Sequence, residues 1–157
     1  MATAAADLFG VVAYPSIFDL DRALEEGSKV TTSTLATGRV VVLPTGTGTW
    51  ATGTSGSSGR AGVIPKLYWG KNVNSAASDS KVVVLTGEGA EVYVEAGDTL
   101  KPGAKVTFGN GGTAKIWTSG KVIGHYVGHY GESIGAGEEP TDATVGQAAR
   151  IRLSGDQ

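Results

Sequence analysis

The chain has 157 residues, of which 25 are glycine and none is cysteine, and its net charge is −2 from 13 basic and 15 acidic residues. This length favours one domain, and 40% apolar residues argue against disorder of the whole chain. The composition excludes disulfides and thiolate metal sites, while the lack of a basic run or of roughly 20 consecutive apolar residues disfavours nucleic acid and membrane as partners.

The N-terminal residues 1–27 predict an extended arm followed by one short helix. The arm ends near Pro15 and carries apolar residues without a helical period, so it either docks on another molecule or forms an edge strand of its own domain. The helix is expected over Ser16–Glu26, with Ser16 as its cap and apolar residues recurring on one face. The start of the chain lacks the basic and long apolar parts of a secretion signal, so we expect synthesis in the cytoplasm.

Residues 28–157 predict a glycine-rich β domain that contains one long loop. Arg39–Leu43 is a β-branched run typical of a strand. Thr45–Gly62 is rich in glycine, serine and threonine and predicts a loop. Trp50 within it either anchors a neighbouring surface or folds back onto its own domain, and both alternatives stay open.

Short strands follow at regular spacing, separated by turn residues such as Asn110–Gly111. They are expected at Val63–Trp69, Lys81–Thr86, Glu91–Glu95, Lys105–Phe108, Thr113–Thr118, Lys121–Val127 and Ala148–Leu153. The fold class is therefore all-β, a compact β-barrel or β-sandwich of about seven to nine short antiparallel strands with the N-terminal arm and one short helix.

Catalytic chemistry finds no support in the sequence, so we expect no enzyme, no cofactor and no metal. The glycine stretch lacks the lysine and helix of a phosphate loop, and no nucleophile elbow occurs. His125 and His129 would share one strand face roughly 13 Å apart, too far to hold one metal within a chain. We interpret them as lying on a sheet surface or at a subunit contact, where only symmetry mates could bring them together around a metal.

Glu91 to Leu153 resembles the small capsid decoration (cement) proteins of tailed bacteriophages. The matching features are the block Val94–Gly103, the strands at Lys105 and Lys121, the glycine turn at Asn110 and the final Val145–Leu153. This resemblance implies a structural protein that binds the major capsid protein on the outside of the head as a homotrimer and stabilises the shell. Another virion module, such as a tail or head-fibre base, and a carbohydrate-binding β module are the alternatives.

The candidate contact residues are apolar, aromatic or histidine side chains in the arm, the long loop and the strands. They are Leu8, Phe9, Val11, Tyr14, Trp50, Tyr68, Trp69, His125 and His129.

Overall fold

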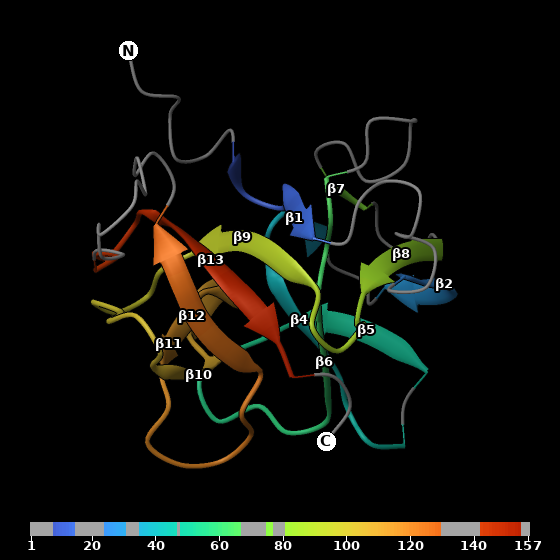
Figure 1. Ribbon diagram of the computed structural model, residues 1–157. Helices are drawn as coiled ribbons and strands as arrows, with labels where there is room; N and C mark the ends of the chain where they lie inside the picture. The colour runs from blue at the N-terminus through green and yellow to red at the C-terminus, as the bar shows by residue number, and fades with distance from the viewer. Residues whose placement is uncertain are drawn as a thin grey trace.

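The computed structural model describes residues 8–14, 24–30, 35–46, 48–66, 75–76, 81–129 and 142–154, and these form an all-β fold (Figure 1). For 24–30, 75–76, 81–82 and 129 only the backbone is described. The strands are β1 (Val12–Tyr14), β2 (Leu24–Val30), β3 (Leu35–Ala36), β4 (Val40–Leu43), β5 (Thr49–Thr52), β6 (Arg60–Val63), β7 (Ser75–Ala76), β8 (Lys81–Leu85), β9 (Glu91–Glu95), β10 (Lys105–Phe108), β11 (Ala114–Ile116), β12 (Gly124–His129) and β13 (Ala148–Leu153), and a short 3₁₀ turn, η2, covers Asn110–Gly112.

Two main sheets divide these strands. The first closes into a barrel in the order β2-β5-β4-β6-β8, in which β2 and β5 are parallel and the other pairs are antiparallel. The second is a six-stranded antiparallel sheet in the order β1-β9-β13-β12-β10-β11. A bridge between Ala96 and Ala114 joins the end of β9 to β11, so this sheet curls into a half-barrel. Figure 1 shows β9, β13 and β12 of the half-barrel beside β4, β5 and β6 of the barrel.

Strands β4 and β8 belong to the core on both of their faces. Val41 and Val84 point into the barrel, where they pack with Leu35, Trp50 and Ile64. Their neighbours Val40, Val42, Val83 and Leu85 point the other way, into the larger core that is shared with the half-barrel. Since successive side chains of a strand alternate between faces, burial on both faces explains why these two strands are continuous apolar runs.

The all-β class is confirmed, but several segments differ from the sequence-based prediction. The long loop expected at 45–62 contains β5 and the first residues of β6, which pair with β4 on both of its edges. The strand expected at 63–69 ends at Val63, and residues 67–69 lie outside the described part. These extra strands, and the two-residue strands β3 and β7, raise the number above the expected seven to nine.

The expected helix over Ser16–Glu26 is wrong in its last three residues. Leu24–Glu26 begin β2, which pairs with β8 and β5. Residues 15–23 lie outside the described part. Pairing with strands distant in sequence thus outweighs the local apolar period at Leu24. The division of the chain at residues 27 and 28 stays a prediction, although β2 runs across it.

Val12–Tyr14 of the arm form an edge strand of this chain. This is the second of the two alternatives for the arm, an edge strand of its own domain. β1 pairs with β9, with Val12 opposite Val92 and Tyr14 opposite Glu91. The amide of Gly10 also donates to the carbonyl of Tyr93 at 2.7 Å, and the amide of Lys66 donates to the carbonyl of Gly10 at 2.8 Å. The described part of the arm is therefore integrated into the half-barrel.

Two glycines of β12 give a matched test of how closely β12 and β13 pack. A Cβ at Gly124 would collide with the carbonyl oxygen of Arg152 and lie 3.0 Å from the Ile151 Cγ2, whereas a Cβ at Gly128 would meet nothing within 4 Å. We expect Gly124→Ala to lower the free energy of unfolding by about 1–3 kcal/mol and Gly128→Ala to change it by less than about 0.5 kcal/mol. Urea denaturation of both variants measures this, and equal losses would contradict the described register.

Candidate interaction surface

The candidate contact residues of the arm differ in how much surface they offer. Leu8 is buried, and Phe9 and Val11 are half-buried. Tyr14 at the end of β1 is 58% exposed and is one of the few large exposed hydrophobic residues of the described part. Among the described residues of the arm, Tyr14 is therefore the large apolar side chain best placed to touch another molecule.

Trp50 lies in the interior of the barrel. Its exposed fraction is 0%, and it packs in the cluster formed by Leu35, Val41, Ile64 and Val84. This is the alternative in which the tryptophan folds back onto its own domain. In this position Trp50 has no surface to offer a neighbour. Tyr68 and Trp69 lie outside the described residues.

The two histidines do not lie on a regular strand. His125 is half-buried on β12, opposite Arg152 of β13 and Lys105 of β10. The register shifts between Tyr126 and Gly128, so the uniform alternation assumed between His125 and His129 is wrong. Among the described residues, no group of three or more histidine, aspartate or glutamate side chains could hold a metal ion.

Charged side chains of β9 and β13 lie side by side on the outer face of the half-barrel. On β9, Val92 and Val94 enter the core, so Glu91, Tyr93 and Glu95 lie on the opposite face. On β13, Ile151 and Leu153 enter the core, so Arg150 and Arg152 lie on that same opposite face. The alternation of core and surface residues thus places the carboxylates of β9 beside the guanidinium groups of β13.

The strand register aligns one residue from each of five neighbouring strands into a row across the sheet. Tyr14 lies opposite Glu91, Glu91 opposite Arg152, Arg152 opposite His125, and His125 opposite Lys105. Trp117, just after β11, extends the row because its amide donates to the carbonyl of Lys105 at 2.9 Å. We call these six residues, together with the adjacent Arg150, the outer row.

Glu91 is the buried centre of the outer row. Its Oε2 accepts hydrogen bonds from the Arg152 Nε at 2.9 Å and the Arg152 Nη2 at 2.7 Å, and its Oε1 accepts from the Arg150 Nε at 2.6 Å. Burial raises the pKa of Glu91, but the hydrogen bonds and charges of Arg152 and Arg150 outweigh burial and hold that pKa below its ordinary value. Burial lowers the pKa of Arg150, and its bond to Glu91 more than reverses this. Both partners are therefore charged at neutral pH.

At the far end of the outer row, a lysine lies over an aromatic ring. The Lys105 Nζ is 5.2 Å from the centre of the Trp117 ring, a distance at which a cation–π interaction stabilises the pair. The Trp117 Nε1 donates to the carbonyl of Gly120 at 3.0 Å, which fixes the ring. The outer row thus ends at one side in Trp117, whose ring is fixed next to β11, and at the other side in the exposed Tyr14 of β1.

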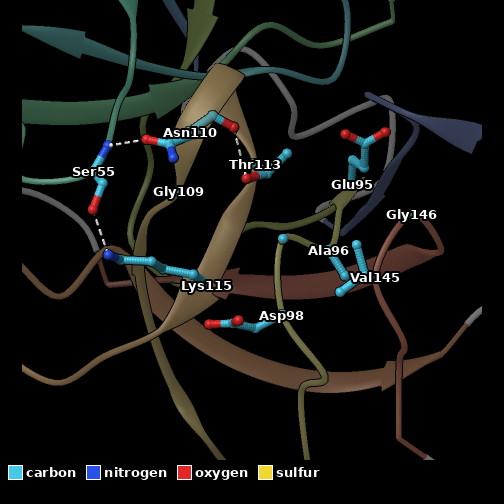
Figure 2. A pocket seen from close by; sticks show the side chains of 11 residues that line it. Ser55, Glu95, Ala96, Asp98, Gly109, Asn110, Thr113, Lys115, Val145 and Gly146 are labelled. Atoms are coloured by element: carbon cyan, nitrogen blue, oxygen red, sulfur yellow. Dashed lines mark hydrogen bonds between the residues drawn. The ribbon is translucent and has the colours of Figure 1, made fainter.

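A polar pocket of about 410 Å³ lies where the turn after β5 meets η2, β11 and the loop after β9 (Figure 2). The Asn110 Oδ1 accepts from the Ser55 amide at 3.3 Å, the Lys115 Nζ donates to the Ser55 Oγ, and the Thr113 Oγ1 donates to the Asn110 carbonyl at 2.9 Å. Because these groups bond to one another, the pocket acts first as a polar junction that fastens a barrel turn to the half-barrel.

Asp98, also on this pocket, covers the free edge of β11. Its Oδ2 accepts from the Ile116 amide at 3.1 Å, and the neighbouring Gly97 amide donates to the Ala114 carbonyl at 2.7 Å. Such contacts blunt an edge strand that would otherwise pair with another chain.

Asp98→Ala should therefore expose an unpaired amide at the β11 edge. We expect a loss of about 1–2 kcal/mol in unfolding free energy and more self-association at high concentration, measured by denaturation and by analytical ultracentrifugation. Asp142→Ala is the matched control, because Asp142 bonds only an exposed lysine among the described residues. Equal behaviour of the two variants would show that Asp98 does not protect the edge.

Sequence reasoning missed the residues of the outer row except Tyr14 and His125. The available pattern was the spacing of Arg150 and Arg152, which places two guanidinium groups on one face of a predicted strand. The partners Glu91, Lys105 and Trp117 lie 33 to 61 positions from these arginines, and the strand register brings them together.

The structure thus defines an all-β protein in which a closed barrel and a half-barrel share one core and present a charged outer sheet face. Among the described residues, no helix is long and apolar enough to cross a membrane.

No family model matches the chain, and no curated protein matches it. A solved structure with a similar fold is the head fibre gp8.5 N base of bacteriophage phi29, with 19% identity and a TM-score of 0.50 over 85% of this chain and 98% of that one. At this identity the likeness shows a shared fold.

Proposed function

We propose that this chain is a structural protein of a bacteriophage virion, located on the outside of the head. The observation that carries the proposal is the fold likeness to a phage head-fibre base, which extends over 98% of that chain. The resemblance of residues 91–153 to capsid decoration proteins supports the same location from the sequence. The sequence resemblance and the backbone likeness thus both support the proposed location.

The physical character of the fold suits this role. The barrel has its own interior cluster and shares a larger core with the half-barrel. A head-surface protein needs such a stable body and contact surfaces, and it needs no reacting groups. The proposed partner is the major capsid protein, bound by a homotrimer of this chain. Repeated contacts on a symmetric shell would add through multivalency, so that each contact can be weak.

Two finer versions of the function remain to be separated. A decoration protein would stabilise the shell, as the sequence resemblance implies. A head-fibre base would anchor a projecting fibre, and the likeness to the phi29 protein favours this version. The two versions differ in whether the chain raises the stability of the shell.

Electron microscopy of particles from the virus that encodes the chain tests the location. We expect density of the barrel and half-barrel at symmetric positions on the outer shell. Heating particles with and without the chain then distinguishes the two versions. Loss of DNA at a lower temperature from particles that lack the chain supports a decoration protein. Equal thermal stability of both kinds of particle supports a fibre base. Density on the tail, or none on the particle, would refute the proposed location.

A further inference from the structure

We propose that the outer row of the half-barrel is a docking surface for an acidic patch on another protein. The inference deepens the proposed function and rests on it for the partner, which would then be an acidic region of the shell protein. The docking surface itself follows from charge, exposure and side-chain type in this chain.

The outer row is cationic although the chain as a whole is acidic. Arg150, Arg152 and Lys105 carry three positive charges and Glu91 carries one negative charge, so the row has a net charge of +2 with His125 counted as neutral. The whole chain has −2, so the rest of it has −4. A positive strip on an acidic protein steers a negative partner to one face and repels it from the others.

The arginines of the outer row keep surface and donors available after they bind Glu91. The Glu91 side chain is 7% exposed, but those of Arg150 and Arg152 are 41% and 56% exposed. Each guanidinium has five N–H donors. Glu91 accepts hydrogen bonds from the Nε and Nη2 of Arg152 and from the Nε of Arg150, whose Nη2 forms an ion pair with the same carboxylate. Arg150 also bonds Tyr93. Glu91 therefore fixes two planar groups in place, which lowers the entropy cost of bonding a partner's carboxylate.

The side-chain types favour a protein partner over nucleic acid. Tyr14, Trp117 and the two arginines are the residue types that dominate binding energy at protein interfaces. The single row has three fixed cations across six strands, whereas a single-stranded nucleic acid requires a groove that follows several phosphates in succession. The charge of the row is complementary to a cluster of carboxylates on a folded surface.

The test titrates the ¹⁵N-labelled chain with a twelve-residue peptide of alternating glutamate and glycine, and separately with a twelve-nucleotide oligothymidine. We expect the peptide to shift amide signals of β9, β10, β12 and β13 next to the outer row, and added salt to reverse the shifts. The double variant Lys105→Glu/His125→Glu should bind the peptide about tenfold more weakly. The control Lys101→Glu reverses a 77% exposed lysine that pairs with Asp142 outside the row, and should bind like the parent chain.

The outcomes separate this inference from the proposed function. The docking surface would be refuted if the peptide shifts no amide signals, if it shifts signals elsewhere, or if the double variant binds it equally well. Tighter binding of oligothymidine than of the peptide would refute the assignment of the surface to a protein partner. Binding of the parent chain and the double variant to purified heads is measured in parallel. Equal binding of both to heads would refute the row as the shell contact while supporting the function. Peptide binding at the row without any binding to heads would refute the proposed function but support the surface.

Discussion

Replacing Trp50 by alanine should lower the free energy of unfolding by about 3–5 kcal/mol, the largest loss we expect from any single substitution. The indole is fully buried inside the barrel, among side chains of β3, β4 and β8 and of Ile64, which follows β6. Removing it leaves a cavity lined by Leu35, Val41, Ile64 and Val84, which are held by strand pairing and cannot collapse fully. Denaturation in guanidinium chloride measures the loss.

Two further variants make the Trp50 prediction specific. The Trp50 Nε1 is buried and has no hydrogen-bond partner among the described residues, so Trp50→Phe removes an unsatisfied donor together with some volume. We expect Trp50→Phe to cost about 1–2 kcal/mol, clearly less than the alanine variant. Trp117→Ala, at a half-buried surface position, should cost less than about 2 kcal/mol. A loss for Trp50→Ala no larger than for Trp117→Ala would contradict the barrel interior.

The strands with strong local patterns could be predicted from the sequence. β9, β10 and β13 have the predicted bounds, Glu91–Glu95, Lys105–Phe108 and Ala148–Leu153, because turns rich in glycine, proline or small polar residues flank them. β5 and β6 could not be found in this way. Their residues are mostly small, such as Ala51, Ala61 and Gly62, and they are strands because both pair with β4.

The outer row shows why the candidate surface was harder to predict than the fold. No local feature of the sequence marks Glu91 as a buried residue. It is buried because β9 lies between β1 and β13, which places Tyr14 on one side and Arg152 on the other. The pairing of strands that are distant in sequence determines which side chains lie side by side. A hydrophobic pattern constrains the register of a strand, but it does not identify the strand with which it pairs.

Replacing Glu91 by glutamine should lower the free energy of unfolding by about 1–3 kcal/mol at neutral pH. The substitution leaves two guanidinium groups side by side without their carboxylate. Breaking a fully buried ion pair costs about 3–5 kcal/mol, and the expected loss is smaller here because Arg150 and Arg152 are partly exposed. Glu95→Gln is the control, because Glu95 is more exposed and bonds a single arginine, Arg39, at 2.9 Å, so its loss should stay below about 1 kcal/mol.

The stabilisation by Glu91 should also depend on pH in one direction. Its pKa is lower in the folded chain than in the unfolded one, because the bonds and charges of Arg152 and Arg150 outweigh the opposing effect of burial. A carboxylate of this kind contributes its full stabilisation above the unfolded pKa of roughly 4.3 and loses it as the pH falls through the folded pKa. The stability difference between the parent chain and Glu91→Gln should therefore be constant near neutral pH and shrink in this acid range. Denaturation curves at several pH values measure it, and a difference that grows on acidification would show that Glu91 is not held as a carboxylate between the two arginines.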